Sequence, residues 1–179
     1  MLGSRARIKL ALLPDKNRGV PLSPLPSKLT ESLYETDFYA WTQYQAQLMR
    51  QGQWHRVDVA NVIEEIESLG RQQRQELRNR LAILLAHLLK WQYQPEKRSR
   101  SWLATIRIQR LDIADLLDDN PSLQPYIAAA FQKAYAKGVQ LAVKETNLAK
   151  GKFPEIAPYT SSQALSNSFY PGSPSDLID

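Results

Sequence analysis

Residues 77–91 of the chain read LRNRLAILLAHLLKW, and this stretch decides the fold. An α-helix turns once every 3.6 residues, so side chains three or four positions apart lie on the same face. The leucines of this stretch have that spacing, at Leu77, Leu81, Leu84, Leu85 and Leu88. The helix is expected to end near Pro95, because the residue before a proline is biased away from helical backbone angles. We interpret it as the central helix of an all-α protein.

Two helices are predicted before the central one. Asp37 and Asp58 are suited to begin them, since an aspartate side chain accepts hydrogen bonds from the free N–H groups of a first helical turn. Gly52 is expected to end the first helix. Gly70 is expected to stop or bend the second, and the sequence leaves open whether a hairpin or a bend lies there.

Two more helices are predicted after Pro95. One is capped by Ser99 or Ser101 and continues to about Leu117. Behind its main apolar face it has a second apolar strip, Ile108 and Leu111, so burial is expected on both sides. The last helix restarts after Pro121 and runs to about residue 146, with small residues that permit close approach to a neighbouring helix.

No segment alternates apolar and polar residues as a half-buried strand does. The predicted fold is a single helical bundle of about five helices over residues 31–159. Residues 1–30 are expected to form a flexible, disordered basic leader, and residues 160–179 a Pro/Ser-rich tail. Six of the 23 basic residues but only one of the 18 acidic ones lie in residues 1–29, so the rest of the chain has 17 of each. The net charge of +5 therefore belongs to the leader.

Composition excludes several classes of protein. The chain has no cysteine, which excludes disulfides, thiolate catalysis and cysteine-bound zinc and suits a reducing cytoplasm. No apolar run is long enough for a secretory signal or a membrane span. The sequence predicts a soluble, cytoplasmic protein with no membrane partner.

Several separate motifs in one order resemble a known family. They are YETDFYAW at 34–41, EEIESLG at 64–70, HLLKW at 87–91 with Gln94-Pro95, Ser101-Trp102 with Thr105-Ile106, and Pro121-Ser122-Leu123. Over roughly residues 33–159 the chain resembles the bacterial family called domain of unknown function 29. This resemblance implies an all-α fold and a bacterial, commonly cyanobacterial, cytoplasmic protein, and it supplies no catalytic or binding residues.

A candidate polar cluster consists of three glutamates and a histidine, namely Glu64, Glu65, Glu67 and His87. Helical bundles hold two metals with glutamates and a Glu-x-x-His pair on each of two helices. Neither histidine of this chain has a glutamate three positions earlier, so we predict no metal site, no cofactor and no catalytic residue. The alternative interpretation is a surface network in which Glu65 and Glu67 pair with arginines of the neighbouring helix.

The second candidate site lies around Pro95, where basic and aromatic residues alternate. Such a segment can bind nucleic acid through phosphate contacts and stacked bases, or dock an acidic protein. The interpretation that we favour is that the tryptophans belong to the core beside a solvated basic turn. With the apolar strip of the fourth helix, the candidate partner-binding residues are Lys90, Trp91, Lys97, Arg98, Arg100, Trp102, Arg107, Ile108 and Leu111.

These observations favour a non-enzymatic protein-interaction or regulatory module, because no catalytic set can be assembled from the chain. The back face of the fourth helix is expected to dock an unknown protein or a second copy. A nucleic-acid-binding protein that uses residues 90–110 is the alternative function, and a carboxylate-metal enzyme is the weaker one.

Overall fold

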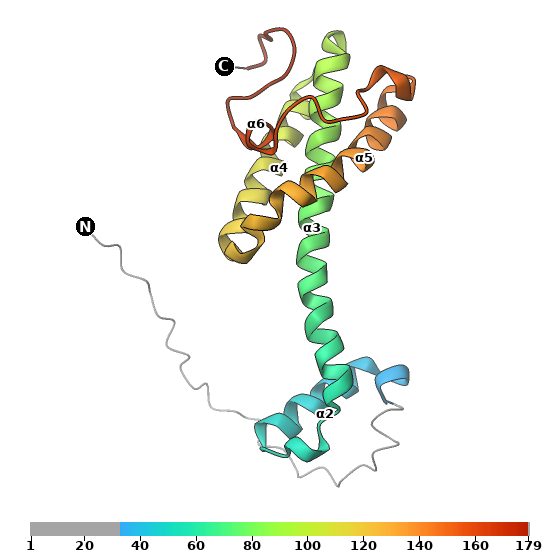
Figure 1. Cartoon of the computed structure of the whole chain (residues 1–179), viewed down its shortest axis with the longest axis vertical. Coiled ribbons are helices and arrows are strands. Elements are labelled where there is room, and N and C mark those ends of the chain that lie inside the picture. The colour runs from blue at the N-terminus through green and yellow to red at the C-terminus, as the bar shows by residue number, and fades with distance from the viewer. Residues whose placement is uncertain (1–32, 179) are drawn as a thin grey trace, which may run out of the picture. The chain divides into compact units, whose positions relative to one another are not determined.

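The computed structural model describes residues 33–178, and every regular element in this part of the chain is a helix (Figure 1). The all-α fold is thus confirmed, and the leader predicted over residues 1–30 lies outside the described residues. The α-helices are α2 (Phe38–Arg50), α3 (Val59–Tyr93), α4 (Arg100–Asp119), α5 (Ile127–Thr146) and α6 (Ser161–Leu165). Short 3₁₀ helices occupy Trp54–Arg56, Pro95–Lys97, Pro121–Tyr126 and Lys150–Lys152.

The chain divides into two compact units, one that ends at Ile63 and one over residues 64–179. In the smaller unit Asp37 caps α2 as predicted, with its Oδ1 accepting from the Ala40 N–H at 2.9 Å. Gln45 Oε1 accepts from the Asp58 N–H at 2.9 Å, and Trp41 Nε1 donates to the Asp58 carboxylate at 3.4 Å. These bonds join α2 to the residue that precedes α3. The predicted domain limits at residues 30 and 159 stay a prediction.

The expected interruption at Gly70 is wrong, because α3 runs through it without a break. A glycine in a helix interior costs only about 1 kcal/mol relative to alanine. A Cβ at Gly70 would have nothing within 4 Å, so no tertiary contact requires a turn there either. The two helices predicted on either side of Gly70 are therefore one helix of 35 residues.

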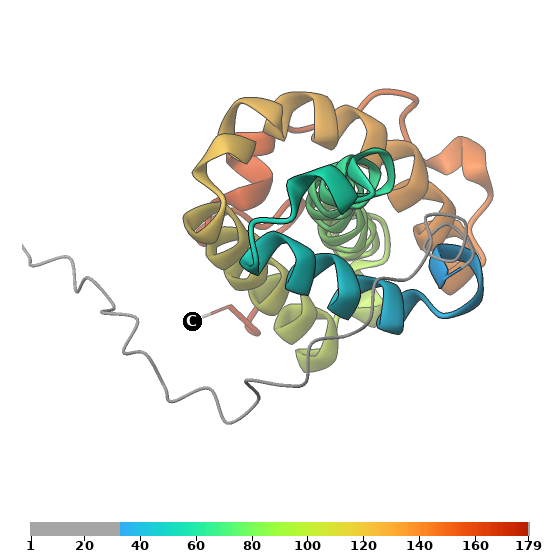
Figure 2. The same ribbon diagram turned by 90° about the horizontal axis from the view of Figure 1, so that it is seen from below.

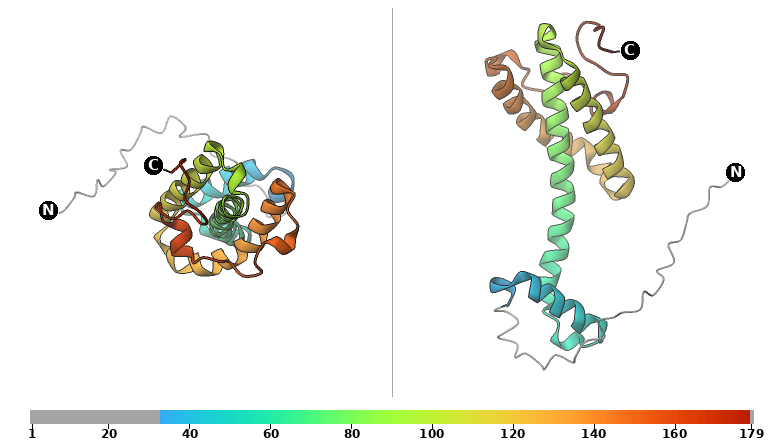
Figure 3. Two further views of the ribbon diagram at one scale, coloured as in Figure 1. Left: turned by 90° about the horizontal axis from the view of Figure 1, so that it is seen from above. Right: turned by 180° about the vertical axis from the view of Figure 1, so that it is seen from behind.

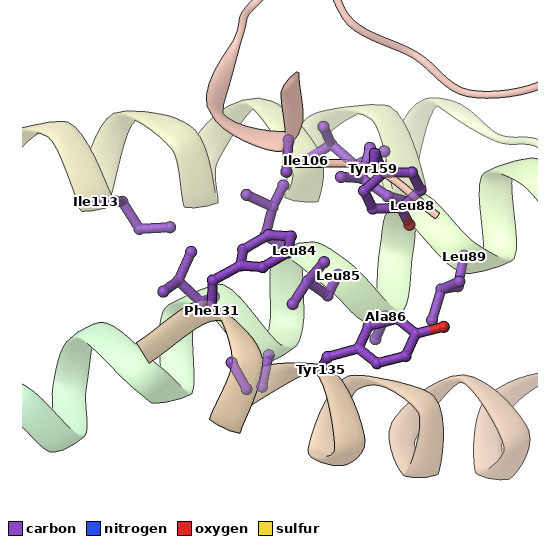
Figure 4. Packing of buried hydrophobic residues seen from close by; sticks show 14 of the residues in the cluster. Leu84, Leu85, Ala86, Leu88, Leu89, Ile106, Ile113, Phe131, Tyr135 and Tyr159 are labelled. Carbon is purple, nitrogen blue, oxygen red and sulfur yellow. The ribbon is translucent and has the colours of Figure 1, made fainter. Parts of the chain in front are cut away.

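In the larger unit the second half of α3 lies between α4 and α5, with α6 against α4 (Figures 1 and 2). The same arrangement is visible from above and from behind in Figure 3. The predicted leucines face inward, and Leu77, Leu81, Leu84, Leu85 and Leu88 are all fully buried. Figure 4 shows this core from close by, with side chains from α3, α4 and α5 and Tyr159 from the C-terminal segment.

Helix α5 packs closely on α3 at Gly138. A Cβ built there would lie 3.0 Å from the Leu85 Cβ and 3.1 Å from the Ala82 carbonyl oxygen. A glycine permits this backbone approach without displacing the atoms of α3. The small residues of the last predicted helix do have the expected role at this position.

The C-terminal strap, which we define as residues 153–178, is irregular apart from α6. The one α-helix of the strap, α6, begins with a capping box between Thr160 and Gln163. The strap packs on the helices, since Phe153, Tyr159 and Ala164 are buried in the core. No helix among the described residues is both long and apolar enough to cross a bilayer.

Candidate interaction surface

In the basic-aromatic segment around Pro95, some side chains point into the core and others point to solvent. Lys90 and Trp91, at the end of α3, point inward. Trp91 is fully buried, and Lys90 is only 4% exposed. The Lys90 ammonium pairs with the Glu145 carboxylate and lies 4.4 Å from the centre of the half-buried Trp102 ring. A buried ammonium needs such partners, because an isolated charge in the interior is costly.

Arg98 is also engaged within the chain. Its Nε donates to the Trp91 carbonyl at 2.8 Å, and its Nη1 donates to the Ser173 carbonyl at 2.8 Å. Its guanidinium lies 5.0 Å from the centre of the Trp91 ring. Arg98 therefore joins the Pro95 turn to the strap.

Arg110 makes a second connection to the strap, one that the sequence analysis did not find. It is 3% exposed, and it donates to the backbone carbonyls of Ala164 at 2.9 Å, Asn167 at 3.5 Å, and Phe169. Burial lowers its pKa, although a guanidinium stays charged in proteins. A signal was present in the sequence, since Arg110 has the spacing of the buried face of α4, between Ile106 and Ile113.

The remaining candidates point outward. Lys97 is exposed in the Pro95 turn, and Arg100, Arg107, Ile108 and Leu111 are exposed on α4. Ile108 is 53% and Leu111 61% exposed. We call this surface the α4 outer face; it comprises the exposed residues Arg100, Ser101, Ala104, Arg107, Ile108, Leu111, Ala114, Asp115, Asp118 and Asp119.

Charge is unevenly distributed along the α4 outer face. Its first half has Arg100 and Arg107, and its second half has Asp115, Asp118 and Asp119. Arg107 lies 3.4 Å from the Tyr170 hydroxyl. None of these five side chains makes an ion pair with another described residue. The two exposed aliphatic side chains lie between the basic half and the acidic half.

The candidate polar cluster is not assembled. Glu67 and His87 lie on the same continuous helix, and twenty residues at 1.5 Å each separate them by about 30 Å. Glu67 pairs with Arg71 at 3.4 Å, one turn along α3 and not on a neighbouring helix as expected. Among residues 33–178 no three acidic or histidine side chains are grouped as metal ligands would be.

His87 is a partly buried side chain whose hydrogen-bond partner is a backbone carbonyl. Its Nδ1 lies 3.0 Å from the Ile83 carbonyl oxygen, to which it donates. Burial lowers the pKa of His87 below its ordinary value of 6.5, and the bond to Ile83 offsets this only in part. The imidazole is therefore held in its neutral form more strongly in the folded chain than in the unfolded chain.

We expect the protein to lose stability as the pH falls below about 6.5, because the unfolded chain then binds a proton at residue 87 before the folded chain does. Denaturant unfolding at about pH 7.5 and pH 5.5 measures the loss, and His87→Gln should reduce it. His55→Gln, at an exposed position, is the matched control and should keep the wild-type pH dependence. Equal pH dependence in wild type and His87→Gln would contradict the assignment.

Three surface hollows of the larger unit have no histidine in their linings. One, of about 580 Å³, lies between α5 and residues 150–156 and is lined by Tyr135, Val139, Phe153 and Ile156 among others. Its charged lining residues are Lys150 and Glu155, and Tyr135 donates its hydroxyl proton to the Pro154 carbonyl at 2.7 Å. A general acid and base facing a common point are not part of this lining.

Comparison with known proteins gives one match. A family model described as Domain of unknown function DUF29 matches residues 33–170. No curated protein and no solved structure matches the chain. The matched residues extend into the strap as far as Tyr170, beside the Arg110 guanidinium at 4.9 Å from the ring centre.

Proposed function

The chain belongs to the family of the domain of unknown function DUF29, and from that premise we propose that it is a non-enzymatic protein-interaction module of the bacterial cytoplasm. The α4 outer face is its docking surface. The observation that supports this function is the exposure of Ile108 and Leu111 side by side on a helix whose opposite face is fully packed.

An apolar pair flanked by charges is typical of a surface that receives another helix. In helix-in-groove recognition the apolar anchors are three or four residues apart, as Ile108 and Leu111 are. The surrounding arginines and aspartates would form the polar rim of such a contact. Because both aliphatic side chains are more than half exposed in the isolated chain, covering them would be favourable.

Nucleic-acid binding through residues 90–110 is less well supported. Base stacking requires accessible aromatic rings, but Trp91 is buried and the Trp102 ring lies beside the Lys90 ammonium. Phosphate binding requires free cations, but Lys90 and Arg98 already bind groups of this chain. Three of the basic residues considered, Lys97, Arg100 and Arg107, remain exposed, so we favour a protein partner.

The docking surface can be tested with paired aspartate substitutions. In a pull-down from the native cell with tagged full-length protein, Ile108→Asp with Leu111→Asp should reduce recovery of the protein partner at least about tenfold, as loss of a central apolar contact does. Ile66→Asp with Leu69→Asp is the comparison variant, because these α3 side chains have the same spacing and similar exposure, at 63% and 61%, so loss of the partner with this variant would assign the contact to α3.

Circular dichroism must show that both double variants keep wild-type helix content. The proposal is upheld if a partner is lost with the α4 variant and retained with the α3 comparison variant, and if the purified partner then binds the wild type but not the α4 variant. An unchanged set of recovered proteins with the α4 variant would overturn it.

A further inference from the structure

We infer that the α4 outer face binds a second copy of this chain, with the two α4 helices antiparallel about a two-fold axis. This inference rests on the proposed function, since it names the partner of the same surface. It follows from the order of apolar, basic and acidic residues along α4.

The apolar pair is centred on the helix. Helix α4 spans Arg100–Asp119, so Ile108 lies as far from its first residue as Leu111 lies from its last. Two antiparallel copies aligned at their midpoints therefore place Ile108 of each copy level with Leu111 of the other. A two-fold contact is made by the same surface on both subunits, and so it must be self-complementary in this way.

The charges complement one another in the same alignment. Arg100 is level with Asp119 of the second copy and one residue from its Asp118. Arg100 and Asp118 also lie on one edge of α4, because eighteen residues make about five full turns. An antiparallel pairing brings that edge of each copy together, so each end of the contact joins a guanidinium to carboxylates.

The middle of the contact has a second charge pairing. Arg107 is within three residues of Asp115 of the second copy, about 4.5 Å along the axis, which an arginine side chain can span. Parallel pairing would instead place Arg100 beside Arg100 and Asp118 beside Asp118, and like charges at equivalent positions are unfavourable. The charge order therefore selects the antiparallel orientation.

Most of these charged groups have no partner within the described part of the chain, and Arg107 contacts the Tyr170 hydroxyl at 3.4 Å. Arg100, Asp115, Asp118 and Asp119 are exposed and make no ion pair among the described residues. Ser101 and Ala104, on the same face, are small enough to let two helices approach closely. A contact of one helix per subunit is near the lower end of interface sizes, so the expected Kd is on the order of 10 µM.

The experiment is sedimentation equilibrium of the full chain between about 1 and 300 µM, which brackets that Kd. The wild type should dimerise, and higher salt should weaken the dimer because exposed charge pairs are screened. Ile108→Asp should raise the Kd at least about tenfold. Thermal unfolding of each variant should match the wild type, since the substituted side chains are exposed.

Charge-reversed variants test the orientation. The first variant has Arg100→Glu and Arg107→Glu, and the second has Asp115→Lys, Asp118→Lys and Asp119→Lys. Each alone should dimerise at least about tenfold more weakly, because all facing charges then have one sign. An equimolar mixture should form a heterodimer at least as stable as the wild type. In it the first variant, which is acidic along the whole face, pairs with the second variant, which is basic along the whole face.

The outcomes separate this inference from the proposed function. A wild type that is monomeric at the highest concentration, or a mixture that forms no heterodimer, overturns the antiparallel dimer. If a different purified protein still binds the wild type and not the Ile108→Asp, Leu111→Asp variant, the docking surface stands without the dimer. A dimer that tolerates those two substitutions uses another surface, which overturns the antiparallel dimer and leaves the proposed function to be decided by the pull-down.

Discussion

Gly138→Leu is expected to lower the free energy of unfolding by about 3 kcal/mol or more, because the new side chain has no space between α5 and α3. A Cβ alone would be 3.0 Å from the Leu85 Cβ, 3.1 Å from the Ala82 carbonyl oxygen and 3.4 Å from the Ala86 amide nitrogen. Two of these three atoms belong to the backbone of α3, which cannot rotate away. The midpoint of thermal unfolding should fall by roughly 10 °C.

The matched control is Gly70→Leu, which makes the same change inside a helix where a Cβ meets nothing within 4 Å. Leucine is a better helix former than glycine, so the control should be stabilised by up to about 1 kcal/mol. Denaturant unfolding followed by circular dichroism measures both variants. Similar stability changes in the two variants would show that the contact between Gly138 and α3 does not restrict the size of this residue.

The core could be predicted from the sequence because periodic apolar residues determine which helix face is buried. Spacing alone places Leu77, Leu81, Leu84 and Leu88 on one inward face, and each is 0% exposed. This succeeds because burying an apolar side chain contributes the largest favourable term, and it depends only on which face the residue occupies.

The length of α3 could not be predicted by the same reasoning. Local rules treat a glycine near the end of an apolar stripe as a stop signal. At Gly70 the residues on both sides favour helix, and the glycine lies in a continuous helix without positive φ. Whether a glycine ends a helix depends on the chain beyond it, which the local pattern does not contain.

The candidate site was predicted only in part, because a basic residue looks the same in sequence whether it faces solvent or the interior. Lys90 finds its carboxylate 55 residues away, at Glu145. Arg110 finds its acceptors more than 50 residues away in the strap. Partners this distant are set by tertiary packing. Helical spacing predicts that Ile108 and Leu111 form a second apolar strip, but the burial expected for that strip is not found within the described residues, where both side chains are more than half exposed.

Arg110→Ala is expected to release the strap and to lower the free energy of unfolding by about 3 kcal/mol. The guanidinium donates to three carbonyls of residues 164–169 and lies 4.9 Å from the centre of the Tyr170 ring. Charge-assisted hydrogen bonds are among the stronger ones, and their loss would leave buried carbonyls without a donor unless the strap separates from α4. The strap should therefore open to restore their hydration.

Hydrogen exchange of residues 160–178 measures this opening, and chymotrypsin should cut the variant faster after Phe169. Arg107→Ala is the matched control, because its guanidinium is exposed and makes one long contact to the strap, at 3.4 Å. Arg110→Lys should be intermediate, since one ammonium cannot reproduce the planar fork of a guanidinium. Leu85→Ala, which removes a buried core side chain, is the positive control and should exchange faster than the wild type. If this control exchanged faster and Arg110→Ala did not, Arg110 would not hold the strap. The strap would then be held by its aromatic and aliphatic contacts, such as that between Tyr159 and Phe169.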